Sequence, residues 1–201
     1  MLGELIRKIT YIDESIDSAI EYRPNYVLVA SILKFEPDHV LESLTQVFDR
    51  DFPFKAAKFK RKNRYGAYKK FLIWGVSQVE INLIIAKEID SKGTESTRQE
   101  CLTELLIQLD GLEIKELIID SRKSPLDKSI GKLNSDDLLS LKLLSGCNLI
   151  SRDMKIVHRT DDEDFLISIP DSIAWIARKF LKDELFPEWK ILENNSKITI
   201  L

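Results

Sequence analysis

Residues 25–33 constrain the fold of this chain more than any other segment, because they form an almost unbroken apolar run. A strand with one face in water alternates apolar and polar residues, whereas a continuous run of this length is typical of a strand buried on both faces. Pro24 precedes the run and marks its start. We therefore expect residues 25–33 to form a central strand of a sheet.

The rest of the chain alternates between strand-like and helix-like patterns. Short runs rich in β-branched residues indicate strands, and apolar residues at helical spacing indicate amphipathic helices. Thr97-Arg-Gln-Glu100 fits a capping box at the start of a helix that Gly111 ends. The expected elements are a strand at 9–12, the strand at 25–33, a helix from Pro37 to Phe48, a helical half-segment at 68–74, a strand at 79–87, a helix at 97–110, a strand at 114–120, a short helix at 135–144, a strand at 154–158, a helix from 168–171 to about 181, and a hairpin at 189–201 that turns at Asn194-Asn195.

Length and composition favour a single domain. The chain has 201 residues, of which 44% are hydrophobic and 31% charged, as in ordinary soluble globular proteins. We expect one domain over residues 1–201, with a basic insertion at about 52–78 and a tail at about 183–201. Cys101 and Cys147 lie in apolar helical patterns and are expected to be reduced core residues. The chain shows neither a signal-peptide core nor an apolar run of membrane-spanning length, so we expect a cytoplasmic protein with no membrane partner.

The net charge of −3 hides an uneven distribution. Residues 52–79 contain eight basic residues and no acid, so the rest of the chain carries 22 basic and 33 acidic residues. Aromatic residues are interleaved with these bases and could stack on nucleobases. The alternative is a solvated or partner-docking basic face whose aromatic residues point inward. On the first interpretation, the candidate nucleic-acid contacts in this segment are Lys58, Lys60, Arg61, Lys62 and Arg64.

Three acids occur at comparable points of separate elements. Asp13 follows the first apolar run within Tyr11-Ile12-Asp13-Glu14-Ser15, and we expect it at a strand end because strands seldom carry Asp in their interior. Asp120 closes the strand at 114–120, and Asp171 lies in the first turn of the last long helix. Each acid also has a structural interpretation: Asp13 and Glu14 could begin a turn, Asp120 could cap a loop, and Ser168-Ile-Pro-Asp171 fits a helix N-terminal box.

The order of these elements is similar to that of the ribonuclease H-like fold, a mixed α/β fold with helices on both faces of its sheet. On this resemblance we expect a five-stranded sheet, followed by the C-terminal hairpin. In that fold the catalytic carboxylates come from the first strand, the fourth strand and the last helix. The resemblance therefore implies that Asp13, Asp120 and Asp171 are the corresponding residues of this chain.

Short motifs carry a closer resemblance, to the bacterial domain of unknown function 3800 family. Tyr-Ile-Asp-Glu-Ser resembles its opening motif, and Tyr26-Val-Leu-Val-Ala30 resembles the central strand of one branch. Later motifs also match, with Asp in place of Glu at 120 and 164 and Pro170 in place of Ala; their residues are Asp120-Ser121-Arg122, Asp127, Asp164, Leu166, Ile167, Ile169, Asp171, Ala174 and Ala177. The family is regarded as ribonuclease H-like and nucleolytic.

Nuclease chemistry at these acids implies a divalent metal ion. Mg²⁺ or Mn²⁺ held by carboxylates neutralises a phosphate and activates a water molecule. Asp13 would be the bridging ligand, with Asp120 and Asp171 completing the set. Glu14 could be an additional catalytic carboxylate or an outer partner, although solvation or a nearby backbone hydrogen bond is the simpler expectation for it. Asp164 has the same two possible roles, and Arg122 could bind phosphate oxygens.

His158 lies near the acidic cluster of residues 161–164 and could carry a proton or bind a metal ion, but strand alternation favours an orientation toward solvent. Three functions stay open. The first is a metal-dependent nuclease of ribonuclease H-like fold. The second is a non-catalytic module that binds nucleic acid or protein, with a protein partner or a homo-oligomer as possible assemblies. The third is a small-molecule phosphohydrolase.

Overall fold

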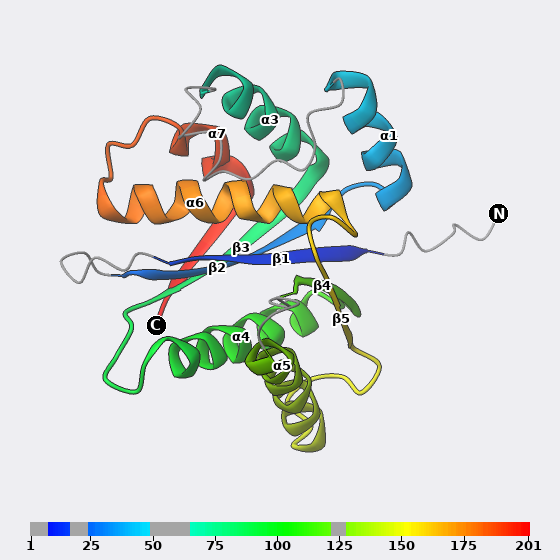
Figure 1. Ribbon diagram of the computed structural model, residues 1–201, viewed down its shortest axis with the longest axis vertical. Helices are drawn as coiled ribbons and strands as arrows, with labels where there is room; N and C mark the ends of the chain where they lie inside the picture. Colours follow the sequence, from blue (N-terminus) through cyan, green and yellow to red (C-terminus); the bar gives the residue numbers. More distant parts are fainter. Residues whose placement is uncertain (1–7, 17–23, 49–64, 122–127) are drawn as a thin grey trace.

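A computed structural model describes residues 8–16, 24–48, 65–121 and 128–201, with the backbone alone described at 128–133. Its centre is a six-stranded mixed sheet in the order β5-β4-β1-β2-β3-β6. Helices cover both faces of this sheet (Figure 1). The strands are β1 (Ile9–Ile16), β2 (Tyr26–Leu33), β3 (Val79–Lys87), β4 (Glu116–Asp120), β5 (Lys155–Arg159) and β6 (Ser196–Ile200).

Strand β2 occupies the middle of the sheet, as the apolar run at 25–33 predicts. All eight of its residues are buried, because β1 and β3 pair with it antiparallel on either side and helices cover both faces. Strand β1 also pairs with β4, in parallel, and β4 pairs in parallel with β5. The three parallel strands β1, β4 and β5 therefore run in the same direction, and Asp13 within β1 and Asp120 at the end of β4 line the same pocket.

The helices form two layers with separate hydrophobic cores. In Figure 1, α1, α3, α6 and α7 lie above the sheet, and α4 and α5 lie below it. Tyr11 and Val29 contribute to the upper core, and Ile12 and Leu28 to the lower core, as the alternation of side chains along β1 and β2 requires. The helices are α1 (Pro37–Val47), α3 (Tyr65–Gln78), α4 (Thr94–Gly111), α5 (Lys128–Gly146), α6 (Ser168–Lys182) and α7 (Trp189–Leu192).

The prediction of a C-terminal hairpin is wrong, and the sheet has six strands where five were predicted. Trp189 and Leu192 lie on the buried side of α7, so this part of the tail packs as a helix. A 3-10 turn over Glu193–Asn195 then leads into β6, which pairs in parallel with the edge of β3. The Asn82 side chain donates from Nδ2 to the Asn195 carbonyl oxygen at 3.2 Å and holds this turn against β3. The tail thus completes the main sheet.

Two helices begin earlier than their patterns predict. Helix α4 starts at Thr94 after Gly93, whose φ of 92° lies in the left-handed region that favours glycine. The capping box at Thr97 is therefore wrong: Thr97 lies inside the helix, where its hydroxyl donates to the Gly93 carbonyl oxygen. Helix α5 starts at Lys128, seven residues before the predicted Ser135. Cys101 is buried as expected, but Cys147 is exposed after the end of α5.

The basic insertion is described only in its second half, α3, which confirms the predicted helical character of 68–74. Tyr68 and Phe71 are buried in the upper core, so these two aromatic side chains point inward. Lys69 and Lys70 are exposed on the same helix. In the part of the chain that the structure describes, no helix has the length and apolar character needed to cross a membrane.

Candidate active site of acidic side chains

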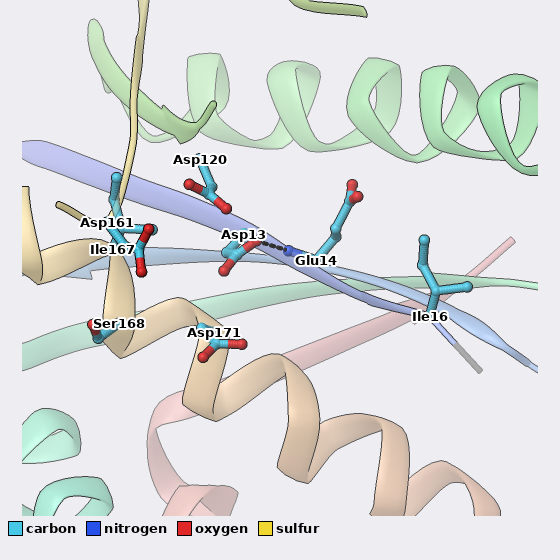
Figure 2. A pocket seen from close by; sticks show the side chains of 8 residues that line it. All are labelled: Asp13, Glu14, Ile16, Asp120, Asp161, Ile167, Ser168 and Asp171. Atoms are coloured by element: carbon cyan, nitrogen blue, oxygen red, sulfur yellow. Dashed lines mark hydrogen bonds between the residues drawn. The ribbon is translucent and has the colours of Figure 1, made fainter. Parts of the chain in front are cut away.

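The three predicted acids lie around one pocket at the ends of β1 and β4. The pocket has a volume of about 310 Å³, and four aspartates and a glutamate contribute to its walls (Figure 2). These acids come from two strands, one loop and one helix, and they are far apart in the sequence. The lining residues are Asp13, Glu14, Ile16, Asp120, Asp161, Ile167, Ser168 and Asp171.

The end of the β1–β4 pairing creates the pocket. The two strands pair only from Ile9 and Glu116 as far as Ile12 and Ile119, and Asp13 follows directly. The prediction that Asp13 lies at a strand end is wrong, because β1 continues to Ile16 while still paired with β2. An acid is tolerated inside β1 because β4 no longer pairs with β1 at this position, which leaves space beside the carboxyl group.

Side-chain alternation directs Asp13 toward α6. Asp13 and Tyr11 are two residues apart, so their side chains point to the same face of the sheet, and Tyr11 belongs to the upper core beneath α6. One carboxylate oxygen of Asp13 accepts a hydrogen bond from the Glu14 backbone amide at 2.7 Å. Asp171 approaches from the other side, in the first turn of α6. The helix dipole stabilises an acid there. The predicted N-terminal box is wrong, however, because the N-cap position is Ile167 and no side chain caps the helix.

The pocket concentrates negative charge around Asp13. Its pKa is raised well above the usual range, first by desolvation and then by the charges of Asp171 and Asp120. Asp171 also contributes to a raised pKa of Tyr68, after the larger effect of burial. Hard oxygen atoms gathered in this way are the donors that Mg²⁺ and Mn²⁺ prefer.

Glu14 points away from the other acids, toward α4 (Figure 2). Its carboxylate accepts a hydrogen bond from the Tyr26 hydroxyl at 2.5 Å and another from Arg98 Nε at 3.2 Å. The sequence predicted that water or a backbone group would bind the Glu14 carboxylate. The structure instead shows it held by two buried side chains. Glu14 lines the pocket while its charge is balanced from behind by Arg98.

Behind the pocket lies a buried charged network that the sequence did not reveal. Arg98, only 2% exposed, binds both carboxylate oxygens of the fully buried Asp137, one of them from Nη2 at 2.7 Å. His158 bonds the same carboxylate through Nε2 at 2.8 Å, so the expectation that it faces solvent is wrong. Desolvation alone would raise the pKa of Asp137, but the hydrogen bonds from His158 and Arg98 lower it below its usual value. The network joins β1, α4, α5 and β5.

One sequence signal could have revealed this network. Arg98 lies three residues before Cys101 and four before Leu102, on the buried stripe of α4. A charged residue on such a stripe requires a buried partner. The identity of that partner, Asp137, depends on how α4 packs against α5, which no local pattern encodes.

Two acids of the loop before α6, Asp161 and Asp164, have different roles. Asp161, from the acidic cluster of residues 161–164, lines the pocket. Asp164, a candidate outer ligand, is not among the lining residues: it accepts a hydrogen bond from the Tyr11 hydroxyl at 3.1 Å and another from the Leu166 amide. Burial raises the pKa of Asp164. Asp164 therefore begins the turn that leads into α6.

Several predicted site residues cannot be placed. Arg122 and Asp127 lie outside the described residues, as do the basic candidates Lys58, Lys60, Arg61, Lys62 and Arg64. Within residues 8–16, 24–48, 65–121 and 128–201, no three His, Cys, Asp or Glu side chains are grouped so that they could hold a metal ion as they lie. The pocket therefore offers suitable donors without a finished ligand shell.

Comparisons with known proteins give a general likeness of fold. Ribonuclease HII from Archaeoglobus fulgidus, solved in complex with PCNA, is 12% identical at a TM-score of 0.48, covering 90% of this chain and 78% of the other. Ribonuclease H2 from Pyrococcus horikoshii OT3 is 14% identical at a TM-score of 0.45, covering 90% and 77%. No protein-family description matches the sequence, so membership in the domain of unknown function 3800 family stays a prediction. No curated protein matches it either.

Proposed function

We propose that this chain is a metal-dependent phosphodiesterase that cleaves nucleic acid at the acidic pocket. One observation carries the proposal: Asp13, Asp120 and Asp171 come from three separate elements to one pocket, and the charges of the other two raise the pKa of Asp13. Like charges gathered in a partly buried hollow destabilise the folded protein unless a cation neutralises them. A cluster of this kind is therefore more consistent with a ligand site than with a purely structural role.

The donor set suits Mg²⁺ or Mn²⁺. Asp13, Asp120 and Asp171 would hold the ion, and Asp161 lines the same hollow and adds to its negative charge. A bound ion would polarise a phosphate oxygen and make water nucleophilic near neutral pH. The side chains must rotate to form the ligand shell, since they do not form one as they lie. The 310 Å³ hollow leaves room for such rotation and for a phosphate group.

The chain's own residues would prepare the site in two ways. Arg98 and Tyr26 hold the Glu14 carboxylate toward α4, so this acid adds less repulsion to Asp13 than an unpaired one would. The N-terminal turn of α6 stabilises the charge of Asp171 beside the pocket. The basic residues Lys58, Lys60, Arg61, Lys62 and Arg64, together with Arg122, would supply contacts to the phosphate backbone.

We expect the parent chain to bind Mn²⁺ or Mg²⁺, and Asp120→Asn and Asp171→Asn each to weaken that binding at least about tenfold, because each substitution removes a charged oxygen donor. Isothermal titration calorimetry of the metal-free protein measures the affinity. Cleavage of labelled single-stranded DNA, duplex DNA, RNA and an RNA–DNA hybrid measures activity in parallel.

Asp162→Asn is the matched control, because Asp162 is an exposed acid of the same loop that does not line the pocket. It should bind metal as the parent does. A parent chain that binds neither ion would refute the nuclease proposal. Hydrolysis of a small aryl phosphodiester without cleavage of any nucleic acid would instead indicate a small-molecule phosphohydrolase.

A non-catalytic interaction module is the second candidate, and one observation favours it: the described acids do not form a ready ligand shell. On that view the fold would persist and nucleic acid would bind through the basic insertion alone. Binding that survives Asp13→Asn and needs no divalent ion, with no cleavage by the parent, would establish this function in place of the nuclease.

A further inference from the structure

A second hollow, here called the edge hollow, lies over β4 and β5 on the face of the sheet that α6 covers elsewhere. It has a volume of about 230 Å³, and Ile9, Ile118 and Val157 supply apolar lining. Val157 is 47% exposed because α6 packs over β1 and β2, whereas Ile156, which points to the lower core, is only 9% exposed. This edge of the sheet is therefore open on the face that carries the acidic pocket.

Three charged side chains also line the edge hollow: Glu116, Lys155 and Arg159. Glu116 and Lys155 are paired in the register of β4 and β5, so an acid lies beside the lysine. Arg159 is exposed at the other end of β5, and its side chain forms no hydrogen bond or ion pair within the part of the chain that the structure describes. Arg159 is therefore the cation of this hollow that is available to an anion.

Arg159 lies next to the acidic pocket. The register of β4 and β5 pairs it with Asp120, which places the two Cα atoms about 4.8 Å apart. The Ser121 backbone amide donates to the Arg159 carbonyl oxygen at 2.6 Å and continues this pairing. Paired residues of neighbouring strands point to the same face of the sheet. Arg159 and Asp120 thus lie side by side, one lining the edge hollow and the other the acidic pocket.

The charge of Arg159 acts on groups beside that pocket. Burial raises the pKa of Asp164, and the positive charge of Arg159 opposes that rise. The same charge opposes the rise in the pKa of Tyr11, of which burial is again the main cause. Charges near a protein surface interact appreciably only over short distances. The guanidinium therefore lies toward these groups and not away from them.

We propose that Arg159 binds a phosphate group of a nucleic-acid strand that runs from the edge hollow into the acidic pocket. The inference rests on the proposed function, because it concerns how that site holds its substrate. An arginine fork can bind two phosphate oxygens at once, and its charge offsets the repulsion that the four aspartates exert on a phosphodiester. A single small phosphate would occupy the acidic pocket alone, whereas a strand supplies phosphates to both hollows.

The lining of the edge hollow also predicts which part of the strand it contacts. Lys155 and Arg159 lie on one face of β5 and four residues apart, which is about 13 Å and enough for a few linked nucleotides. Among the described residues, its lining includes no aromatic side chain and no Asn or Gln. Base stacking and bidentate contacts to adenine need such side chains. We therefore expect contacts to phosphate and sugar, which carry little sequence information.

Removing the charge of Arg159 tests the inference. Arg159→Gln should weaken the binding of a labelled single-stranded oligonucleotide at least about fivefold, by the same factor for two unrelated base sequences. The slope of log affinity against log salt concentration should become shallower by about 0.7, as expected for one lost phosphate contact. Val157→Glu, which places an acid in the edge hollow, should weaken binding by a similar factor. Fluorescence anisotropy with Ca²⁺ in place of Mg²⁺, to limit cleavage, measures these affinities.

Arg152→Gln is the matched control, because Arg152 is an exposed arginine just before β5 that lines neither hollow. It should change the affinity less than about twofold. Arg159→Lys keeps the charge and should keep the salt dependence of the parent chain. Calorimetric titration should give Arg159→Gln the same Mn²⁺ affinity as the parent, since this variant leaves the aspartates intact.

Two results would overturn the inference: a parent chain that does not bind the oligonucleotide, or an Arg159→Gln variant that binds it as well as Arg152→Gln does. Failure of the nuclease proposal would appear in a separate measurement, as a parent chain that binds no Mn²⁺ whatever its affinity for the oligonucleotide. The two failures are therefore distinguishable.

Discussion

Replacing Arg98 by methionine is expected to lower the free energy of unfolding by about 3–5 kcal/mol, the usual cost of removing one partner of a buried ion pair. Methionine has a similar length but cannot bond the Asp137 carboxylate, which is fully buried. Among the partners described, the His158 bond at 2.8 Å and a long bond of 3.4 Å from the neutral Gln99 amide would remain. The Glu14 carboxylate would lose its Arg98 partner at the same time.

The double variant Arg98→Met/Asp137→Leu distinguishes two causes of lost stability: the loss of the Arg98–Asp137 interaction, and the burial of an Asp137 charge without Arg98. Replacing both members of a buried pair by apolar residues is often neutral or even stabilising. We therefore expect this variant to recover more than half of the stability that Arg98→Met loses. Urea denaturation followed by tryptophan fluorescence measures the free energy of unfolding of both variants, since Trp74 and Trp189 are buried in the upper core.

Lys87→Met provides a matched control, because it breaks the ion pair with Glu100 at the surface near α4. Both members of that pair are partly exposed, so its loss should cost no more than about 1 kcal/mol. If Arg98→Met lowered the free energy of unfolding no more than this control does, the Arg98–Asp137 network would contribute little to stability.

The pH dependence gives an independent check on the same network. The pKa of Asp137 is lowered in the folded protein, so its charge stabilises the fold above its unfolded pKa and this contribution is lost as the pH falls through the folded value. In Arg98→Met the Asp137 carboxylate has lost its Arg98 partner and can take up a proton in acid. The stability difference between the two proteins should therefore narrow as the pH falls below about 4.

Local patterns predicted the parts of this fold that depend on local chemistry. The apolar run of β2 required burial on both faces, and Asp120 was expected at the end of its strand because the apolar residues of β4 lead directly into it. Asp171 was placed in the first turn of α6, where the structure has it. These patterns therefore placed Asp120 and Asp171 in the elements that carry them in the structure.

Other features depend on contacts between distant segments, and the sequence could not reveal them. Strand β6 exists because β3 has a free edge and Asn82 holds the preceding turn there, neither of which is visible in the tail itself. Asp13 lies within its strand because β1 stays paired with β2 as far as Ile16, although its pairing with β4 ends at Ile12. Arg98 and Asp137 meet only because α4 packs on α5. In each case a long-range contact decided what a local pattern left open.

Asp13→Asn is expected to stabilise the metal-free protein while removing its activity. Asparagine has nearly the same shape and can still accept the Glu14 amide hydrogen bond, but it carries no charge to be repelled by Asp171 and Asp120. A shift of one pH unit in a pKa is equivalent to about 1.4 kcal/mol, so we expect a gain of at least about 1 kcal/mol near pH 7. For a protein of this size, that raises the melting temperature by about 2–4 °C.

The sign of the pH dependence distinguishes relief of repulsion from a general packing effect. The folded protein raises the pKa of Asp13, so it binds more protons there than the unfolded chain does, and the parent should lose stability as the pH rises from about 4 toward the raised pKa. Asp13→Asn lacks this group, so its advantage should grow over the same interval. An advantage that did not change with pH would indicate packing instead.

Metal should reverse the ranking of the two proteins. A saturating divalent ion stabilises only a chain that binds it, so Mn²⁺ should raise the melting temperature of the parent and leave that of Asp13→Asn nearly unchanged. Nucleic-acid cleavage should fall by at least about 100-fold in the variant, comparable to the loss of other electrostatic groups at active sites. Differential scanning calorimetry with and without Mn²⁺, with Asp162→Asn as the control, measures the reversal. If Asp13→Asn is destabilised without metal and still stabilised by it, Asp13 is a structural residue and the metal site lies elsewhere.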